Sequence, residues 1–433
     1  MNNKTPIIDF LISFSFIVYI GYIILSGIDT NIQWISISVL ILSNVYSLYK
    51  CRYNKFLVII WTIILYCNYS IVYENWISHT QDLFNTEISE KVTNSSINLL
   101  ATFNALLYLF SPKKVYASHV KNLSIFTNAI TPGFLTYIII IVCLIVIFLL
   151  GFDAPSIPGE RGSPKPVFEY AICIFILGYH FFKNKRQLII LDILILLFAL
   201  KNFIFGGRIL GIQFLTCYYI FRWGSLSLKK ISVIALPMVL LMYIIGVVRG
   251  ELLSGNFDTH QILEALFSNG LALDTAYSAY HTSKVYMYIY DLIPNHIDFF
   301  LAFLAALLIG YGSFRHLLLS NVSHDYMVNY EGGLFPFHFY FFGNILLVIL
   351  STWIFRPLFT WVSKLTTKRI SSLEKCIAIL IVCSTFRWYL YSPFSMIREI
   401  IFLSILYIII KVTHEPNRNI AFHGVRETSC KVK

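Results

Sequence analysis

The chain has 433 residues, of which 57% are hydrophobic and only 13% are charged. A soluble globular protein carries roughly 25% charged residues, so this composition excludes a mostly water-exposed chain and indicates one that faces lipid or itself. The net charge is +11, but the basic residues fall in small clusters between apolar runs and do not form one patch. We therefore expect a multi-pass membrane protein and no binding of nucleic acid.

Twelve apolar runs follow one another along the chain, and each is interpreted as a transmembrane helix. They are Ile7–Leu25, Ile32–Tyr49, Phe56–Tyr73, Ile97–Phe110, Phe134–Leu150, Val167–Phe182, Leu188–Phe203, Ile209–Trp223, Ile231–Val248, Phe337–Phe355, Cys376–Tyr391 and Met396–Ile410. The predicted fold class is therefore all-α, with about 12 transmembrane helices.

The basic residues of the connecting segments alternate with the predicted helices. Clusters follow the even-numbered runs: Lys50, Arg52 and Lys55; Lys113, Lys114 and Lys121; Lys183, Lys185 and Arg186; Arg222, Lys229 and Lys230; Arg356, Lys364, Lys368, Arg369 and Lys375; and Lys411. Because Lys and Arg are enriched in cytoplasmic loops, both termini are predicted to be cytoplasmic.

A thirteenth apolar run, Ile297–Ile309, is too short to span, because roughly 13 helical residues cannot cross a hydrocarbon core of about 30 Å. If it did cross, the basic cluster that begins at Arg356 would move outside. We therefore predict a re-entrant or interfacial helix near 297–309 within one large external (periplasmic) loop. The predicted organisation is helices one to nine in 1–248, the loop in 249–336, helices ten to twelve in 337–410 and a cytoplasmic tail in 411–433.

Several motifs of catalytic chemistry are absent from the sequence. It has no GxxxxGK(S/T) phosphate loop, no HExxH helix and no Asp-x-Asp pair that could clamp a sugar-nucleotide diphosphate through a metal. We therefore expect no metal and no cofactor. Any glycosyl chemistry must use another donor, most naturally one dissolved in the membrane.

Two arginines open and close the predicted hairpin of the eighth and ninth helices. Arg208 follows Gly206 and Gly207 at the outer end of one helix, and Arg249 ends the other. Because the inner connection is short, both guanidinium groups are expected at one depth near the outer surface. Two such groups can bind a pyrophosphate bidentately, and the glycines let the backbone approach the anion. The alternative is that both arginines extend to lipid phosphates.

Other charged residues are additional candidates. The further arginines predicted on the outer side are Arg161, Arg315, Arg387 and Arg398. Each of them either adds to the anion site or contacts lipid phosphates. Asp192 lies within the seventh predicted helix, where a carboxylate is costly, and we expect it to pair with Arg186 at the inner interface.

The segment Glu331–Asn344 joins the large loop to the tenth predicted helix. The Gly332-Gly333 pair permits an unusual turn, and Pro336 marks the start of the helix. His338 then falls in the first turn, where a neutral imidazole can act as the general base on a sugar hydroxyl. Glu331 is the other candidate base. In the alternative interpretation, His338 belongs to an aromatic belt and Glu331 is a solvated loop acid.

The chain resembles the bacterial O-antigen and oligosaccharide-repeat-unit polymerases (Wzy). The resemblance is carried by Gly206-Gly207-Arg208, Val248-Arg249-Gly250 and Glu331–Asn344. The length, the helix count and the large external loop before a late helix are similar as well. Relatives often carry an acidic residue after the proline, where this chain has His338.

The resemblance implies a lipid-linked-donor (GT-C-like) glycosyltransferase in a bacterial inner membrane. Its substrates would be undecaprenyl-pyrophosphate-linked oligosaccharides, joined without a metal into an O-antigen or capsular-type polysaccharide at the outer face. Membrane lipid and a polysaccharide chain-length regulator are the other partners it implies. An O-antigen ligase and a flippase or transporter of lipid-linked oligosaccharides are the alternatives.

Overall fold

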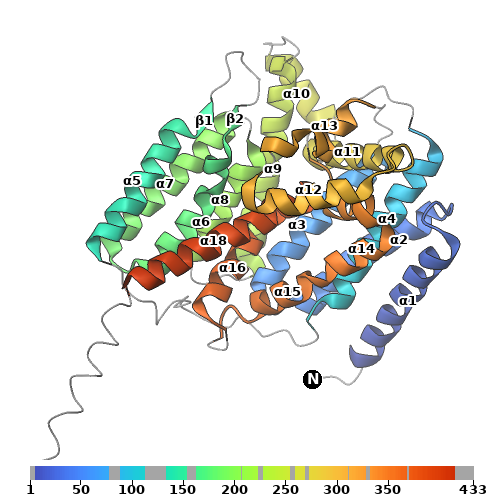
Figure 1. The fold of residues 1–433 in the computed structure, drawn as a ribbon, viewed down its shortest axis with the longest axis horizontal. Coiled ribbons are helices and arrows are strands. Elements are labelled where there is room, and N and C mark those ends of the chain that lie inside the picture. Colours follow the sequence, from blue (N-terminus) through green and yellow to red (C-terminus); the bar gives the residue numbers. More distant parts are fainter. Residues whose placement is uncertain are drawn as a thin grey trace, which may run out of the picture.

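The computed structural model describes residues 5–77, 88–112, 133–153, 162–205, 207–222, 228–253, 259–268, 273–310, 312–327, 332–367 and 370–414. Helices make up almost all of this part of the chain (Figure 1). Those of the first half are α1 (Thr5–Ser26), α2 (Gln33–Cys51), α3 (Lys55–Val72), the π-helical turn η1 (Tyr73–Ile77), α4 (Glu90–Phe110), α5 (Phe134–Leu150), α6 (Pro166–Phe181), α7 (Lys185–Ile204) and α8 (Arg208–Arg222).

The helices of the second half are α9 (Leu228–Leu253), α10 (Thr259–Ser268), α11 (Asp274–Tyr290), α12 (His296–Ile309), the 3₁₀ helix η2 (Gly312–Leu317), α13 (Leu319–His324), α14 (Phe335–Trp353), α15 (Phe355–Ser363), α16 (Ser372–Cys383), α17 (Thr385–Leu390) and α18 (Pro393–His414). Two short strands, β1 (Phe152–Asp153) and β2 (Ser163–Pro164), pair antiparallel between α5 and α6.

Six of the described helical stretches are long and apolar enough to cross a membrane, which confirms the prediction of an all-α membrane protein. They are Ile7–Ser26, Gln33–Cys51, Lys55–Ile77, Lys185–Ile204, Phe335–Ser363 and Pro393–Thr413. Shorter apolar helices occupy Phe134–Leu150, Pro166–Phe181, Leu240–Arg249 and His296–Ile309. Large apolar side chains such as Phe10, Leu135 and Leu346 are exposed on the outside of the bundle, as expected where lipid covers a protein.

The C-terminal helices join two groups of helices. In one group α2 packs on α3 and α4, and in the other α7 packs on α8 and α5 packs on α6 (blue and green in Figure 1). α17 contacts both α3 and α8, while α16 contacts α3, α6 and α8. The helices between residues 372 and 390 therefore lie where the two groups meet.

The segment between α9 and α14, predicted as the external loop, is mostly helical where the structure describes it. α10 and α13 lie at the top of the molecule in Figure 1, at the end of the bundle that also carries β1 and β2. α11 packs inward on α3, α4 and α14, and α12 lies against α14 and α18. A helix thus occupies His296–Ile309, the range in which the sequence predicts a short one.

Two of the predicted continuous helices are interrupted. α14 breaks at Gly343 and Asn344, where Asn344 has a φ of 59° and a ψ of −165° and is therefore outside the helical region. The break separates a buried half, Phe335–Phe342, from a second half with exposed residues such as Leu346. The other interruption is at Ser384, between α16 and α17.

The predicted ion-pair partner of Asp192, Arg186, is wrong. Asp192 Oδ2 lies 2.8 Å from Nε of Arg222, and Asp192 Oδ1 accepts a hydrogen bond of 2.8 Å from the Tyr179 hydroxyl. Arg186 precedes Asp192 by six residues, a spacing that puts the two side chains on different faces of α7. The carboxylate is therefore paired between helices and not within one.

Candidate functional site

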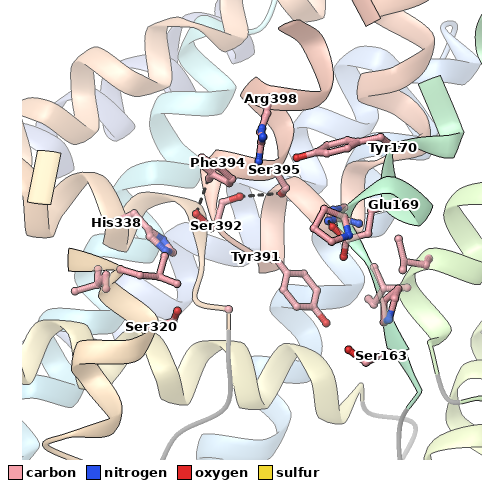
Figure 2. Close-up of a pocket in the computed structure, with 18 of the residues that line it drawn as sticks. Ser163, Glu169, Tyr170, Ser320, His338, Tyr391, Ser392, Phe394, Ser395 and Arg398 are labelled. Atoms are coloured by element: carbon pink, nitrogen blue, oxygen red, sulfur yellow. Dashed lines mark hydrogen bonds and ion pairs between the residues drawn. The ribbon is translucent and has the colours of Figure 1, made fainter. Parts of the chain in front are cut away.

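A cavity of about 590 Å³ lies where the ends of α6, α8, α14, α17 and α18 meet (Figure 2). It is lined by Gly162, Ser163, Pro164, Pro166, Glu169, Tyr170, Ile209, Leu210, Leu318, Leu319, Ser320, Gly332, His338, Phe342, Arg387, Tyr391, Ser392, Phe394, Ser395 and Arg398. Small-molecule sites typically enclose about 300–1,000 Å³. His338 and Glu169 stand on opposite sides with Tyr391 between them, and Arg398 lies at one edge beside Tyr170 and Phe394 (Figure 2).

A glycine turn places His338 in the cavity wall. Gly332 and Gly333 have φ angles of 125° and 102°, which only glycine adopts readily, so the predicted turn is confirmed. Pro336 stands in the first turn of α14, also as predicted. His338 follows in the same turn and is buried, with 5% of its surface exposed.

Side chains of α11 fix this turn from behind. Ser283 Oγ accepts a hydrogen bond of 2.8 Å from the Leu334 amide, and the Tyr286 hydroxyl donates one of 2.6 Å to the Gly332 carbonyl. The Tyr286 ring also meets the His338 ring edge-on, with centroids 5.1 Å apart. α11, which precedes α14 in the chain, thus holds the turn that carries the imidazole at the cavity.

The short helix α17 is anchored by polar groups in the core and presents Arg387 to the cavity. The Tyr389 hydroxyl donates to Asn68 Oδ1 at 2.6 Å and accepts from Asn104 Nδ2 at 2.9 Å. These bonds tie α17 to α3 and α4. Trp388 Nε1 donates to the Ile381 carbonyl at 3.1 Å, which ties α17 to α16. A buried network of this kind is rigid when its members are satisfied.

Arg387 is held between two carboxylates that differ in their surroundings. Its Nη2 pairs with Oε2 of Glu169, and its Nε lies 3.4 Å from Oε1 of Glu399. The Glu169 side chain is 26% exposed and lines the cavity. The Glu399 side chain is 0% exposed and faces the packed interior. Only one of the two carboxylates is therefore accessible from the cavity.

Arg398 is held by aromatic rings. Its guanidinium carbon lies 5.6 Å from the centroid of the Tyr170 ring and 5.4 Å from that of Phe394, a geometry that favours a cation. Among the residues that the structure describes, no carboxylate lies within ion-pair distance of Arg398. Its charge is thus available to an anion in the cavity.

The rest of the lining is suited to a polar ligand with flat faces. Hydroxyl groups come from serines at the ends of several elements, namely Ser163, Ser320, Ser392 and Ser395. Tyr170 and Tyr391 add rings that can stack on a sugar. An imidazole, a free guanidinium and hydroxyls in one cavity can bind a phosphate and position a hydroxylated substrate.

Arg208, the first predicted anion ligand, is engaged elsewhere. It is buried, and its Nη2 donates to both carboxylate oxygens of Asp274, at 2.5 and 2.7 Å, and to Thr275 Oγ1 at 3.2 Å. Its Nη1 donates to the Met242 carbonyl at 3.0 Å. Arg208 therefore joins α8, α9 and α11, and it is not among the lining residues of the cavity.

Arg249 lies half-buried near the end of α9. Gly246, about one helical turn earlier, lies so close to Nη1 of Arg208 that a side chain at this position would collide with it. Gly207 is close to Asn202 in the same way, because an added Cβ would stand 2.8 Å from Asn202 Oδ1. The pyrophosphate role of Arg208 and Arg249 stays a prediction.

The remaining predicted site residues divide into three groups. Arg387 lines the cavity together with His338. Arg315 is exposed on η2 and is not among the lining residues. Glu331, Arg161 and Gly206 lie outside the described residues.

Sequence reasoning missed the two acids that hold Arg387. Glu399 stands within the last apolar run, and Glu169 stands near the start of the sixth. A carboxylate in an apolar run is itself a signal, because it is costly unless it has a function or a partner. This criterion, applied above only to Asp192, would have selected both residues.

No group of three or more His, Cys, Asp or Glu side chains that could hold a metal ion occurs within the described part of the chain. The chain matches no protein-family model, and neither a curated protein nor a solved structure is significantly similar to it.

Proposed function

We propose that this chain is a glycosyltransferase that polymerises undecaprenyl-pyrophosphate-linked oligosaccharide repeat units at the outer face of a bacterial inner membrane. The observation that carries the proposal is the cavity in which the free guanidinium of Arg398 lies with the buried imidazole of His338. The proposed architecture is GT-C-like, with about twelve transmembrane helices, cytoplasmic termini and the segment 249–336 on the outer side.

In this reaction the cavity binds the lipid pyrophosphate of the donor at Arg398. As the bond between the anomeric carbon and the pyrophosphate oxygen breaks, negative charge develops on the leaving group. A fixed cation at this position stabilises that charge more than it stabilises the intact donor, and it does so without a metal. The rings of Tyr170 and Phe394 keep the guanidinium in place.

The acceptor is the non-reducing hydroxyl of a second lipid-linked repeat unit. Its oxygen forms the new bond to the anomeric carbon, and its proton passes to a base, for which His338 lies in the cavity wall. Glu331 remains the second candidate from the sequence. Tyr391, between His338 and Glu169 in Figure 2, is placed to stack on a sugar ring.

The test is reconstitution of the purified chain in lipid nanodiscs with lipid-linked repeat units. We expect a ladder of lengthened, lipid-linked glycans. Transfer of a preformed glycan to lipid A core with no ladder would identify a ligase instead. Translocation of the lipid-linked units across a vesicle membrane, with their length unchanged, would identify a flippase and overturn the proposal.

A further inference from the structure

Glu169 and Glu399, the two carboxylate partners of Arg387, differ in the free-energy cost of breaking their ion pair with it. Glu399 is fully buried on α18, and neither of its carboxylate oxygens has a hydrogen-bond partner in the described structure. A buried charge without a partner is very costly, so Glu399 is expected to stay with Arg387 when Glu169 leaves it.

Glu169 is in the opposite situation. It stands in the first turn of α6, lines the cavity and is partly exposed. A carboxylate is stabilised near a helix N-terminus, and the cavity can solvate it. Glu169 can therefore release Arg387 at moderate cost, while Glu399 continues to neutralise the guanidinium.

Arg387 and Arg398 line the same cavity, as does Tyr170 of α6, whose ring centroid lies 5.6 Å from the guanidinium carbon of Arg398. A pyrophosphate has two phosphoryl groups and can engage two guanidinium groups at once. Glu169 occupies Nη2 of Arg387, so an anion that bridges Arg398 and Arg387 through this nitrogen displaces Glu169. Glu169 and the pyrophosphate thus compete for one set of donors.

We infer that Glu169 is an internal competitor for Arg387 that promotes release of the pyrophosphate lipid after transfer. This inference rests on the proposed function. The product is a multiply charged anion that would otherwise remain bound to two arginines. The return of Glu169 to Arg387 lowers the affinity for that product, so Glu169 raises turnover by weakening binding. No bond is formed or broken in this step.

The primary test measures binding of geranylgeranyl pyrophosphate, a sugar-free probe, to the full chain in nanodiscs. We expect Glu169→Gln to bind it about tenfold more tightly than the unaltered chain, since one charge-assisted hydrogen bond no longer competes. Asp153→Asn is the matched control, because it removes the carboxylate of an exposed ion pair with Lys165 at 3.1 Å, at the same end of the bundle but outside the cavity lining. Unchanged or weaker binding by Glu169→Gln would overturn the inference, since a purely structural role predicts a loss.

A second measurement follows the Glu169 carboxylate itself. The infrared difference spectrum on adding the probe should contain a shifted carboxylate band that is absent in Glu169→Gln. Absence of that band in the unaltered chain, with the probe bound, would also overturn the inference.

The kinetic arm separates this inference from the proposed function. Glu169→Gln should keep the rate of the first transfer, lose about tenfold in steady-state turnover and be inhibited at lower concentrations of the probe. If the unaltered chain binds the probe but makes no polymer, the proposed function fails, while the competition between Glu169 and the pyrophosphate stands. If the unaltered chain makes polymer and Glu169→Gln turns over normally, the inferred competition at Arg387 fails and the proposed function stands.

Discussion

The two arginine sites of this protein, Arg208 and Arg398, have the same side chain in opposite environments. Arg208 has its donors satisfied by a carboxylate, a hydroxyl and a carbonyl from two other helices. Arg398 is held by two rings and has no carboxylate within ion-pair distance in the described structure. A guanidinium with internal partners stabilises the fold, whereas one without them is available to a ligand.

The largest expected effect is at Arg398. Arg398→Gln should reduce polymer synthesis by about a thousandfold, because in the proposed mechanism it removes the cation that stabilises the leaving group. The thermal unfolding midpoint should change little, since the residue has no ion pair to lose among the described residues. The measurement is chain elongation by purified protein, with Arg315→Gln as an exposed arginine control. Comparable polymer in both variants would remove Arg398 from the mechanism.

His338 lies in the same cavity and should act on the acceptor. His338→Gln is expected to lower the elongation rate by about a hundredfold, the effect of losing a general base. Binding of geranylgeranyl pyrophosphate should be retained, because the imidazole does not face the leaving group in this mechanism. Normal elongation by the variant would transfer the base role to Glu331.

At Arg208 the expected effect is on stability. Arg208→Gln should lower the free energy of unfolding by about 2 kcal/mol, because the hydrogen bonds of the buried guanidinium to Asp274, Thr275 and the Met242 carbonyl are lost. The measurement is the midpoint of unfolding in detergent. Comparing this variant with the double variant Arg208→Gln/Asp274→Asn checks that Arg208 has a structural role as the partner of Asp274. A variant that stays as stable as the unaltered chain and yet makes no polymer would restore Arg208 as an anion ligand.

The smallest expected effect tests how closely α9 approaches Arg208. Gly246→Ala should cost about 1 kcal/mol, because the new methyl group displaces the guanidinium from its partners. Gly21→Ala is the control on another apolar helix, since nothing lies within 4 Å of the added carbon, and it should be neutral or slightly stabilising. Equal effects at both positions would contradict the close packing at Gly246.

Local features of the fold were predictable. The turn at Gly332 and Gly333 has positive φ angles that few other residues adopt, and the helix start at Pro336 follows from the preference of proline for the first helical turn. The interruption of α14 at Asn344 was not predictable, because an apolar run does not reveal where its backbone bends. Of the predicted site residues, His338 and Arg387 line the cavity, whereas Arg208 does not.

The sequence alone determined that this is an all-α membrane protein, because apolar runs and scarce charge leave few other ways to satisfy the backbone. Only the tertiary structure decided which arginines are free. Asp274, the carboxylate partner of Arg208, lies 66 residues away, and Glu169, one of the two carboxylate partners of Arg387, lies 218 residues away. Pairing at such separations depends on which helices pack together, and neither periodicity nor charge alternation along the chain encodes that packing.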